Sequence, residues 1–160
     1  SALADAGVSL VVEPHMPGTH LDGAAFLGER GRPVIGLTLR YDRLDNFWFA
    51  LLHELAHVAH HLRQGEIDQV YDDLEATPDA MEREADLHDG EALIPEHAWE
   101  TSLARYLQSE TSVIQFADEI GVGPCVVAGR IRHESRNFTL LQSLIGQGEV
   151  RRQFSEVRFG

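Results

Sequence analysis

Three short apolar stretches near the amino terminus have the composition of β-strands. Residues 8–13, 23–27 and 34–39 are rich in β-branched and other apolar side chains, which strands favour. Between the second and third, residues 28–31 read Gly-Glu-Arg-Gly, which is typical of a turn. Pro33 stands at the beginning of the third stretch, where a strand tolerates proline. The pattern predicts a hairpin within a small, mainly antiparallel sheet.

A longer apolar segment follows and has the length of a helix. Most positions from 47 to 59 are apolar, so this helix should be buried on most sides. Asp42 and Asp45 are both candidate N-caps, and their negative charge suits the positive end of a helix. We expect the helix to run to about Leu62 and to end before Gly65.

The second half of the chain has the periodicity of helices. Residues 66–80 are acidic and irregular, which predicts a loop beside the preceding helix. Thr77 and Pro78 then resemble an N-cap and a first helical residue. Further helices are predicted over 78–93, 95–107, 111–120 and 123–134. The sequence therefore predicts an α+β fold, with a small sheet packed on the apolar helix and a helical C-terminal half.

The apolar helix carries the sequence His53-Glu54-Leu55-Ala56-His57. Positions i and i+4 lie on one face of a helix, so both imidazoles can reach the same point. Two neutral imidazoles on one face can hold Zn²⁺, and Glu54 lies beside them as a candidate general base. A His-Glu-His cluster among apolar residues is costly to bury unless its polar atoms have binding partners, and a metal ion is such a partner.

A catalytic zinc needs a third protein ligand and an open position. In one class of zinc peptidases this ligand is a histidine ten residues after the first, but here that position is Arg63. The other option is a glutamate from a later helix. Glu82 fits because Asp86, four residues on, can orient a zinc-bound histidine. Glu84, with His88 one turn beyond it, is the alternative ligand.

Length and charge narrow the class of protein. The chain has 160 residues, of which 43% are hydrophobic, and we expect residues 1–160 to form one domain. No apolar run approaches the ~20 residues of a membrane span, so no membrane contact is expected. A net charge of −13 repels phosphate groups, which argues against nucleic-acid binding by this domain. The single Cys125 suits a reducing cytoplasm.

Several segments together resemble the ImmA/IrrE family of zinc metallopeptidase-like domains. The similarity extends beyond the His-Glu-x-x-His helix and spans most of the chain, over residues 19–26, 33–42, 47–57, 71–74, 82–95 and 127–132. More closely, the chain is similar to the C-terminal domain of HigA-like, Xre-type antitoxin regulators. Those regulators carry an N-terminal helix-turn-helix domain, so the resemblance implies a fragment of a longer protein that binds DNA elsewhere. One departure is His88-Asp89, where family members often have apolar or small residues.

These observations predict a zinc peptidase that acts on a regulatory protein. His53, His57 and Glu82 would bind Zn²⁺, and Glu54 would take a proton from the attacking water. His133 and Tyr71 are candidate donors to the oxyanion of the tetrahedral intermediate. We expect residues 34–39 to offer a strand edge for an extended substrate.

A second hypothesis assigns the domain to another class. A sensor or protein-interaction domain of an antitoxin or regulator can keep the same zinc ligands without cutting a peptide. The general base favours the enzyme, because a structural zinc site normally fills all four positions with protein ligands. The sequence leaves the substrate and the oligomeric state open.

Overall fold

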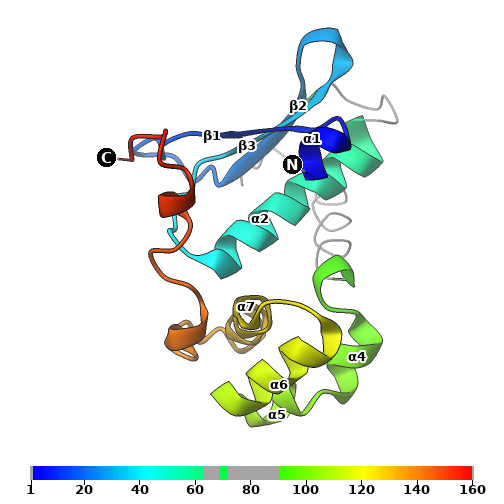
Figure 1. Cartoon of the computed structure of the whole chain (residues 1–160), viewed down its shortest axis with the longest axis vertical. Coiled ribbons are helices and arrows are strands. Elements are labelled where there is room, and N and C mark those ends of the chain that lie inside the picture. The colour runs from blue at the N-terminus through cyan, green and yellow to red at the C-terminus, as the bar shows by residue number, and fades with distance from the viewer. Residues whose placement is uncertain (1, 63–68, 72–90, 160) are drawn as a thin grey trace.

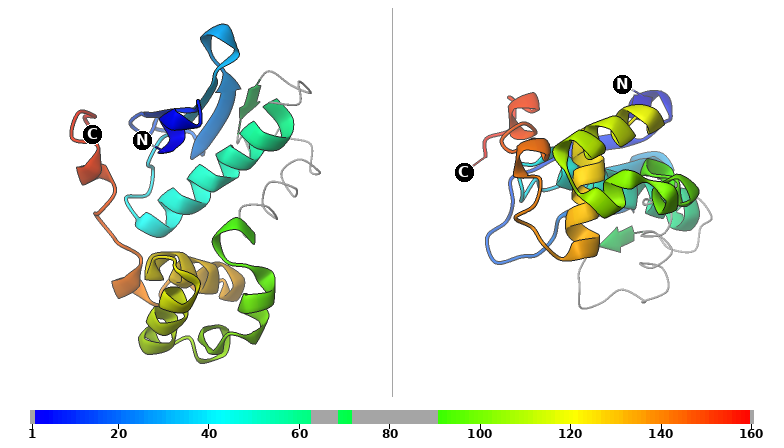
Figure 2. Two further views of the ribbon diagram at one scale, coloured as in Figure 1. Left: turned by 45° about the vertical axis from the view of Figure 1, so that its right-hand side comes forward. Right: turned by 90° about the horizontal axis from the view of Figure 1, so that it is seen from below.

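A computed structural model describes residues 2–62, 69–71 and 91–159 of the chain. The fold is α+β, as predicted, with α2 (Leu44–His57) between a sheet and a group of helices (Figure 1). The left view of Figure 2 also shows α2 between these two parts. Within the described residues, no helix is both long and apolar enough to cross a membrane.

The sheet has the strand order β1-β3-β2-β4. Its strands are β1 (Ser9–Val12), β2 (Gly23–Leu27), β3 (Pro33–Leu37) and β4 (Gln69–Tyr71). The predicted hairpin is confirmed, because β2 and β3 pair antiparallel with Leu27 opposite Pro33. β4 pairs antiparallel with β2, whereas β1 pairs parallel with β3. The sheet is therefore mixed, with antiparallel pairs in the majority.

The expectation that residues 34–39 form an edge strand is wrong. β3 is hydrogen-bonded to β1 on one side and to β2 on the other. Both rows of its backbone groups are therefore occupied, and no extended substrate can pair with them. Ile35 and Leu37 are fully covered on this central strand.

The predicted helix over the His-Glu-x-x-His sequence is confirmed as α2, and a π-helical turn, Val58–Leu62, continues it to the expected end. The N-cap prediction is wrong, because the cap is Arg43. Both aspartates have other partners. Asp45 is buried and accepts two hydrogen bonds from Arg43 at 2.9 and 3.0 Å. Asp42 accepts from the backbone amides of Val150 and Arg151 at 2.9 and 3.0 Å.

The helical half contains α4 (Glu96–Thr101), α5 (Leu103–Leu107), α6 (Glu110–Ile120) and α7 (Pro124–Ser135). The helices predicted over 111–120 and 123–134 are confirmed. The single helix predicted over 95–107 is two helices, because Ser102 is extended and caps α5, accepting from the Ala104 amide at 3.1 Å. Residues 91–93 are helical, and the rest of the predicted 78–93 helix lies outside the described residues.

In the described part of the chain, two apolar clusters form the core, and α2 contributes to both. Leu51 packs in the sheet cluster with Ile35, Leu37 and other strand residues. Phe49 and Leu52 pack against the helical cluster, which includes Trp99 and Phe116. At Gly129 of α7 the two helices come so close that a Cβ would lie 2.9 Å from the Cβ of Asp45. The histidine-bearing helix is therefore held from two sides.

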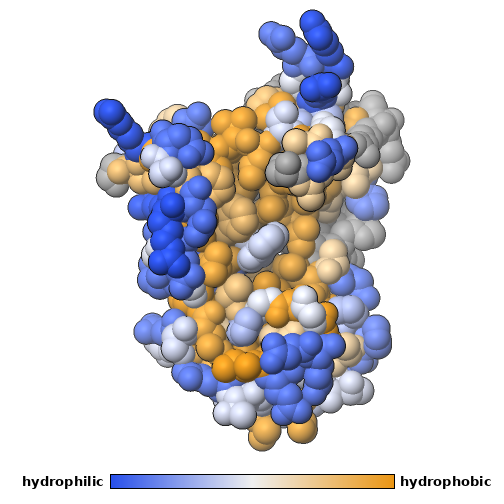
Figure 3. Space-filling view, viewed as in Figure 1, coloured by the Kyte–Doolittle hydropathy of each residue, from blue (hydrophilic) through white to orange (hydrophobic). Residues whose placement is uncertain are grey.

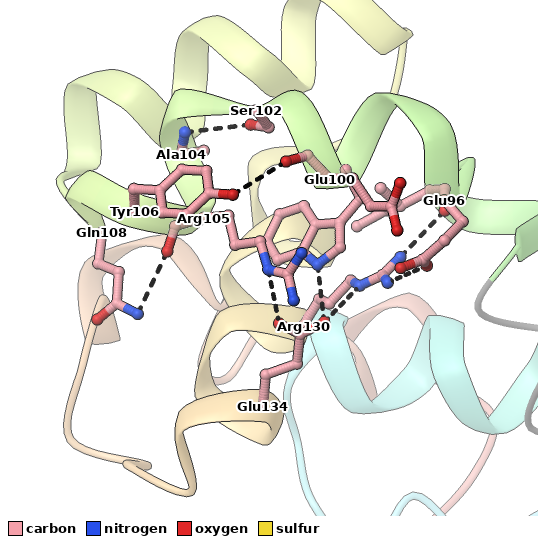
Figure 4. A network of polar contacts seen from close by, with 11 residues as sticks. Glu96, Glu100, Ser102, Ala104, Arg105, Tyr106, Gln108, Arg130 and Glu134 are labelled. Carbon is pink, nitrogen blue, oxygen red and sulfur yellow. Dashed lines mark hydrogen bonds and ion pairs between the residues drawn. The ribbon is translucent and has the colours of Figure 1, made fainter.

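A polar network joins α4 to α7 at the edge of the helical cluster (Figure 4). The Arg130 guanidinium lies over the Trp99 ring, 4.7 Å from its centre, and donates to the Ile94 carbonyl at 3.1 Å and to Glu134 at 3.1 Å. It also pairs with Glu96. The buried Trp99 donates from Nε1 to Glu134 at 2.7 Å. This network fixes the chain where it enters α4 from residues 91–94.

Candidate active site

The two motif histidines converge on one point. His53 and His57 lie one turn apart on α2, and their Nε2 atoms are 3.1 Å apart. The ring centroids are 4.7 Å apart with the planes at 76°. His57 is fully buried. The i, i+4 spacing therefore does bring both imidazole nitrogens together, as predicted from the sequence.

The distance between the two nitrogens tests whether they suit a shared zinc ion. Two nitrogen ligands of a tetrahedral zinc, each about 2.0–2.1 Å from the metal, lie about 3.3–3.4 Å apart. The observed 3.1 Å between the Nε2 atoms of His53 and His57 is close to this value. The same distance also fits a hydrogen bond in which one nitrogen carries the proton. With both nitrogens unprotonated, the pair fits two of the ligands of a zinc site.

Glu54 lies between α2 and the sheet, next to this pair. Its side chain is buried, with 1% exposure, and its carboxylate rests against Gly23 at the beginning of β2. A Cβ at position 23 would lie 2.5 Å from Oε1 of Glu54 and 2.9 Å from Cγ, closer than any side chain tolerates. The absence of a side chain at Gly23 therefore provides the space in which the carboxylate lies.

Gly23 is a site residue that the sequence does not single out. The pattern predicts it as the start of a strand, and it lies within residues 19–26 of the family resemblance. A glycine inside a strand often marks a close approach of another group, and this was the available signal. The signal does not say which group approaches, because Glu54 meets Gly23 only after α2 has packed across β2.

The two histidines and the exposed Trp48 lie on different sides of α2. Figure 3 shows a broad apolar area on the face where α2 lies in Figure 1, and Trp48 of α2 is 41% exposed. At about 100° per residue, His53 and His57 point about 140° and 180° away from Trp48 around the helix axis. The candidate site and the exposed face of Trp48 therefore lie on different sides of α2.

The two candidate oxyanion donors lie in different parts of the fold. Tyr71 is the last residue of β4 and pairs with Ala24, the residue after Gly23. Its backbone is therefore at the corner of the sheet where Glu54 lies. His133 is exposed near the end of α7, a helix that meets α2 through Gly129 at Asp45 and Phe49. Both roles stay predictions.

The predicted third ligand lies outside the described residues, and so do its alternative and its supporting carboxylate: Glu82, Glu84 and Asp86. Within residues 2–62, 69–71 and 91–159, no three His, Cys, Asp or Glu side chains form a group able to hold a metal ion. The described part of the site thus consists of two histidines and the neighbouring glutamate. The choice between Glu82 and Glu84 stays a prediction.

Comparison with known proteins gives the family. No curated protein gives a significant sequence match. A family model described as the IrrE N-terminal-like domain, peptidase family M78, matches residues 6–132. The match covers most of the chain and includes both motif histidines and Glu54. Members of this family are typically zinc-dependent. The chain therefore belongs to the M78 peptidase family and is a zinc-peptidase-like domain of the IrrE N-terminal type.

Proposed function

We propose that this domain is a zinc-dependent peptidase that cuts a peptide bond in a cytoplasmic regulatory protein, and that it serves a DNA-binding regulator or antitoxin. The observation that carries the proposal is the site geometry in a chain of this family. Two imidazole nitrogens lie 3.1 Å apart beside a buried glutamate on the same helix. A purely structural zinc site needs no general base, so it gives that glutamate no role.

His53 and His57 would hold the ion, with Glu82 as the proposed third ligand and Asp86 as the residue that orients a histidine. When bound, Zn²⁺ supplies Lewis acidity, which polarises a peptide carbonyl and makes water more acidic. Three protein ligands leave a coordination position for the reacting groups. His57 is buried, whereas His53 is half-buried.

Glu54 acts as the general base. Its carboxylate accepts a proton from the attacking water and passes it to the leaving amine, which is the usual exchange for a carboxylate beside a scissile amide. The carboxylate must stay within hydrogen-bond reach of that water, and packing against Gly23 limits its movement. Gly23 is therefore a positioning residue for the base.

A donor to the developing oxyanion completes the proposed machinery. The strand register does not favour Tyr71, because it pairs with Ala24, and Ala24 and Gly23 belong to opposite faces of the sheet. Tyr71 and His133 are therefore both proposed on their donor chemistry alone. Replacing Tyr71 with phenylalanine and His133 with glutamine tests each role, and the variant with lower peptidase turnover identifies the donor.

Metal analysis tests the ligands first. The purified chain should bind about one Zn²⁺, and a variant with His53→Ala and His57→Ala together should lose it. The Glu54→Gln variant should keep the metal, because the glutamate is not a ligand. Unchanged metal content in the double-histidine variant would disprove the assignment of these ligands.

Cleavage is then tested with zinc-loaded wild-type chain and the Glu54→Gln variant, each incubated with a soluble protein extract from the cells that produce the chain. Mass spectrometry of new peptide amino termini should find sites that appear only with wild type, within DNA-binding regulators. Loss of the base should reduce cleavage by at least ~10². If wild type produces no new termini beyond those of Glu54→Gln, the domain is a metal-binding sensor or interaction domain instead.

A further inference from the structure

The short helix α5 exposes an unusual amount of apolar surface. Leu103, Tyr106 and Leu107 are 68%, 69% and 63% exposed. They are three of the nine large hydrophobic side chains that are well exposed in the described residues, and all three come from one helix of five residues. Single exposed apolar residues are common on protein surfaces, but clustered ones mark interaction sites. This helix lies in the helical half, on the side away from α2 (Figure 1).

A groove of about 420 Å³ runs beside this surface, between α4–α5 and α6. Its lining includes Ala104 and Phe116, which are 1% and 6% exposed, and the well-exposed Leu103 and Leu107. Ile120 of α6 also lines the groove, together with serine, threonine and Gln115 side chains. The groove thus combines covered apolar side chains with exposed leucines, which can take apolar side chains from a partner.

The helix α5 is held rigidly in this exposed position. Ser102 caps its start through the Ala104 amide, and Gln108 ends it in the left-handed conformation at φ 50°. The Tyr106 hydroxyl donates to the Glu100 carbonyl at 3.2 Å, and Arg105 pairs with Glu134 of α7 at 3.5 Å (Figure 4). A partner that binds here therefore meets a preformed surface, which lowers the entropy cost of binding.

The charges of the residues around the groove indicate which kind of partner it would bind. Residues 96–121 contain five acidic side chains and one arginine. That arginine, Arg105, is directed to Glu134 and lies near the Trp99 ring rather than in the groove. Glu119 is the charged residue in the lining, where it accepts from Gln115 at 3.0 Å. The segment that forms the groove is therefore acidic as a whole, and Glu119 places one negative charge in the groove itself.

From this combination we propose that the α5–α6 groove binds a basic amphipathic helix of a partner protein. Apolar side chains at i, i+3 or i+4, and i+7 would enter the groove, and lysine or arginine on one flank would meet Glu119. The groove is lined from Thr111 to Ile120 of α6, a length of about 14 Å, which matches about nine helical residues. The proposal is independent of the peptidase activity, because no groove residue belongs to the candidate active site.

Two labelled peptides of about 12 residues test the proposal. Both carry leucine at the three anchor positions. One has lysine on its polar face, and the other has glutamate at the same positions. Fluorescence anisotropy measures their binding to the whole 160-residue chain at about 0.15 M salt, where long-range attraction is screened. The lysine peptide should bind at least ~10-fold more tightly than the glutamate peptide.

Variants of exposed residues show where the lysine peptide binds. Leu107→Gln and Glu119→Lys should each weaken binding about 10-fold. The matched controls, Phe138→Gln and Glu156→Lys, change an exposed aromatic residue and an exposed glutamate that do not line the groove, and they should leave binding unchanged. All four residues are on the surface, and circular dichroism checks that each variant folds.

Three results would overturn the proposal. The first is that the lysine peptide does not bind. The second is that Glu156→Lys weakens binding as much as Glu119→Lys, which would show a general attraction of the peptide to an acidic protein. The third is that sedimentation finds a dimer, that Leu107→Gln dissociates this dimer, and that the lysine peptide does not. A second copy of the chain would then occupy the groove.

Discussion

Replacing Gly23 with alanine is expected to displace the Glu54 carboxylate. The new Cβ would lie 2.5 Å from Oε1 and 3.0 Å from Cδ of that side chain, so either β2 or the glutamate must shift. Overpacking of this kind costs about 1–3 kcal/mol. Alanine has less conformational freedom than glycine in the unfolded chain, which offsets about 0.4–1 kcal/mol of this cost. We therefore expect a net loss of about 1–2 kcal/mol in the free energy of unfolding.

Thermal unfolding measures this loss, and a second glycine supplies the control. For a protein of this size, about 2–4 °C of melting temperature corresponds to 1 kcal/mol, so Gly23→Ala should melt roughly 2–8 °C below wild type. Gly36 lies in the neighbouring strand, and a Cβ there would be 4.0 Å from its nearest contact, the Ala24 carbonyl oxygen. Gly36→Ala should therefore show no such loss.

A double variant identifies the side chain responsible. Combining Gly23→Ala with Glu54→Ala removes the group that the new methyl meets, so the alanine at position 23 should then cost little. Zinc binding by Gly23→Ala should stay near the wild-type level, while peptidase turnover falls because the base has moved. An equal loss of melting temperature from Gly23→Ala in both backgrounds would refute the steric argument.

Three further predictions follow from other parts of the chain. Arg130→Met removes the contacts that join α4 to α7 and should lower the free energy of unfolding by about 2–4 kcal/mol in urea titration, whereas Arg152→Met removes an ion pair in solvent and should cost little. Burial, followed by nearby acidic groups, raises the pKa of the Cys125 thiol. The unfolded thiol therefore ionises first as the pH rises, so stability should decrease above about pH 8.5, and Cys125→Ala should remove this dependence. Glu82→Ala should abolish tight zinc binding and Glu84→Ala should not, and the reverse result in a zinc titration would move the third ligand by two residues.

The sequence predicted those features that depend on neighbouring residues. The strands around Ile35 and Ala25, the hairpin between them and the helix over His53 and His57 all follow from local composition, periodicity and turn residues. The convergence of the two histidines follows from helix geometry alone. These features need no information about which distant segments pack together.

Features that depend on distant partners were not predictable in the same way. β3 is the central strand because β1 pairs with the edge that β2 leaves open. The composition of the strands does not determine this pairing. Asp42 is not an N-cap because it binds backbone amides more than a hundred residues later. The closeness of Gly23 to Glu54 likewise appears only when the helix crosses the sheet. Local signals name candidate roles, and tertiary packing decides which of them is used.

The attachment of the C-terminal segment to the sheet half affects how the chain reaches its native state. Val150 and Arg151 bind Asp42 and Leu39 across sequence separations of 108 and 112 residues, and Phe154 and Phe159 pack on the sheet cluster. Contacts of such separation close large loops, which slows folding relative to a helical protein with local contacts. During synthesis, the His-Glu-x-x-His helix leaves the ribosome about a hundred residues before this segment. The sheet half therefore acquires these packing partners only after about a hundred further residues have been synthesised.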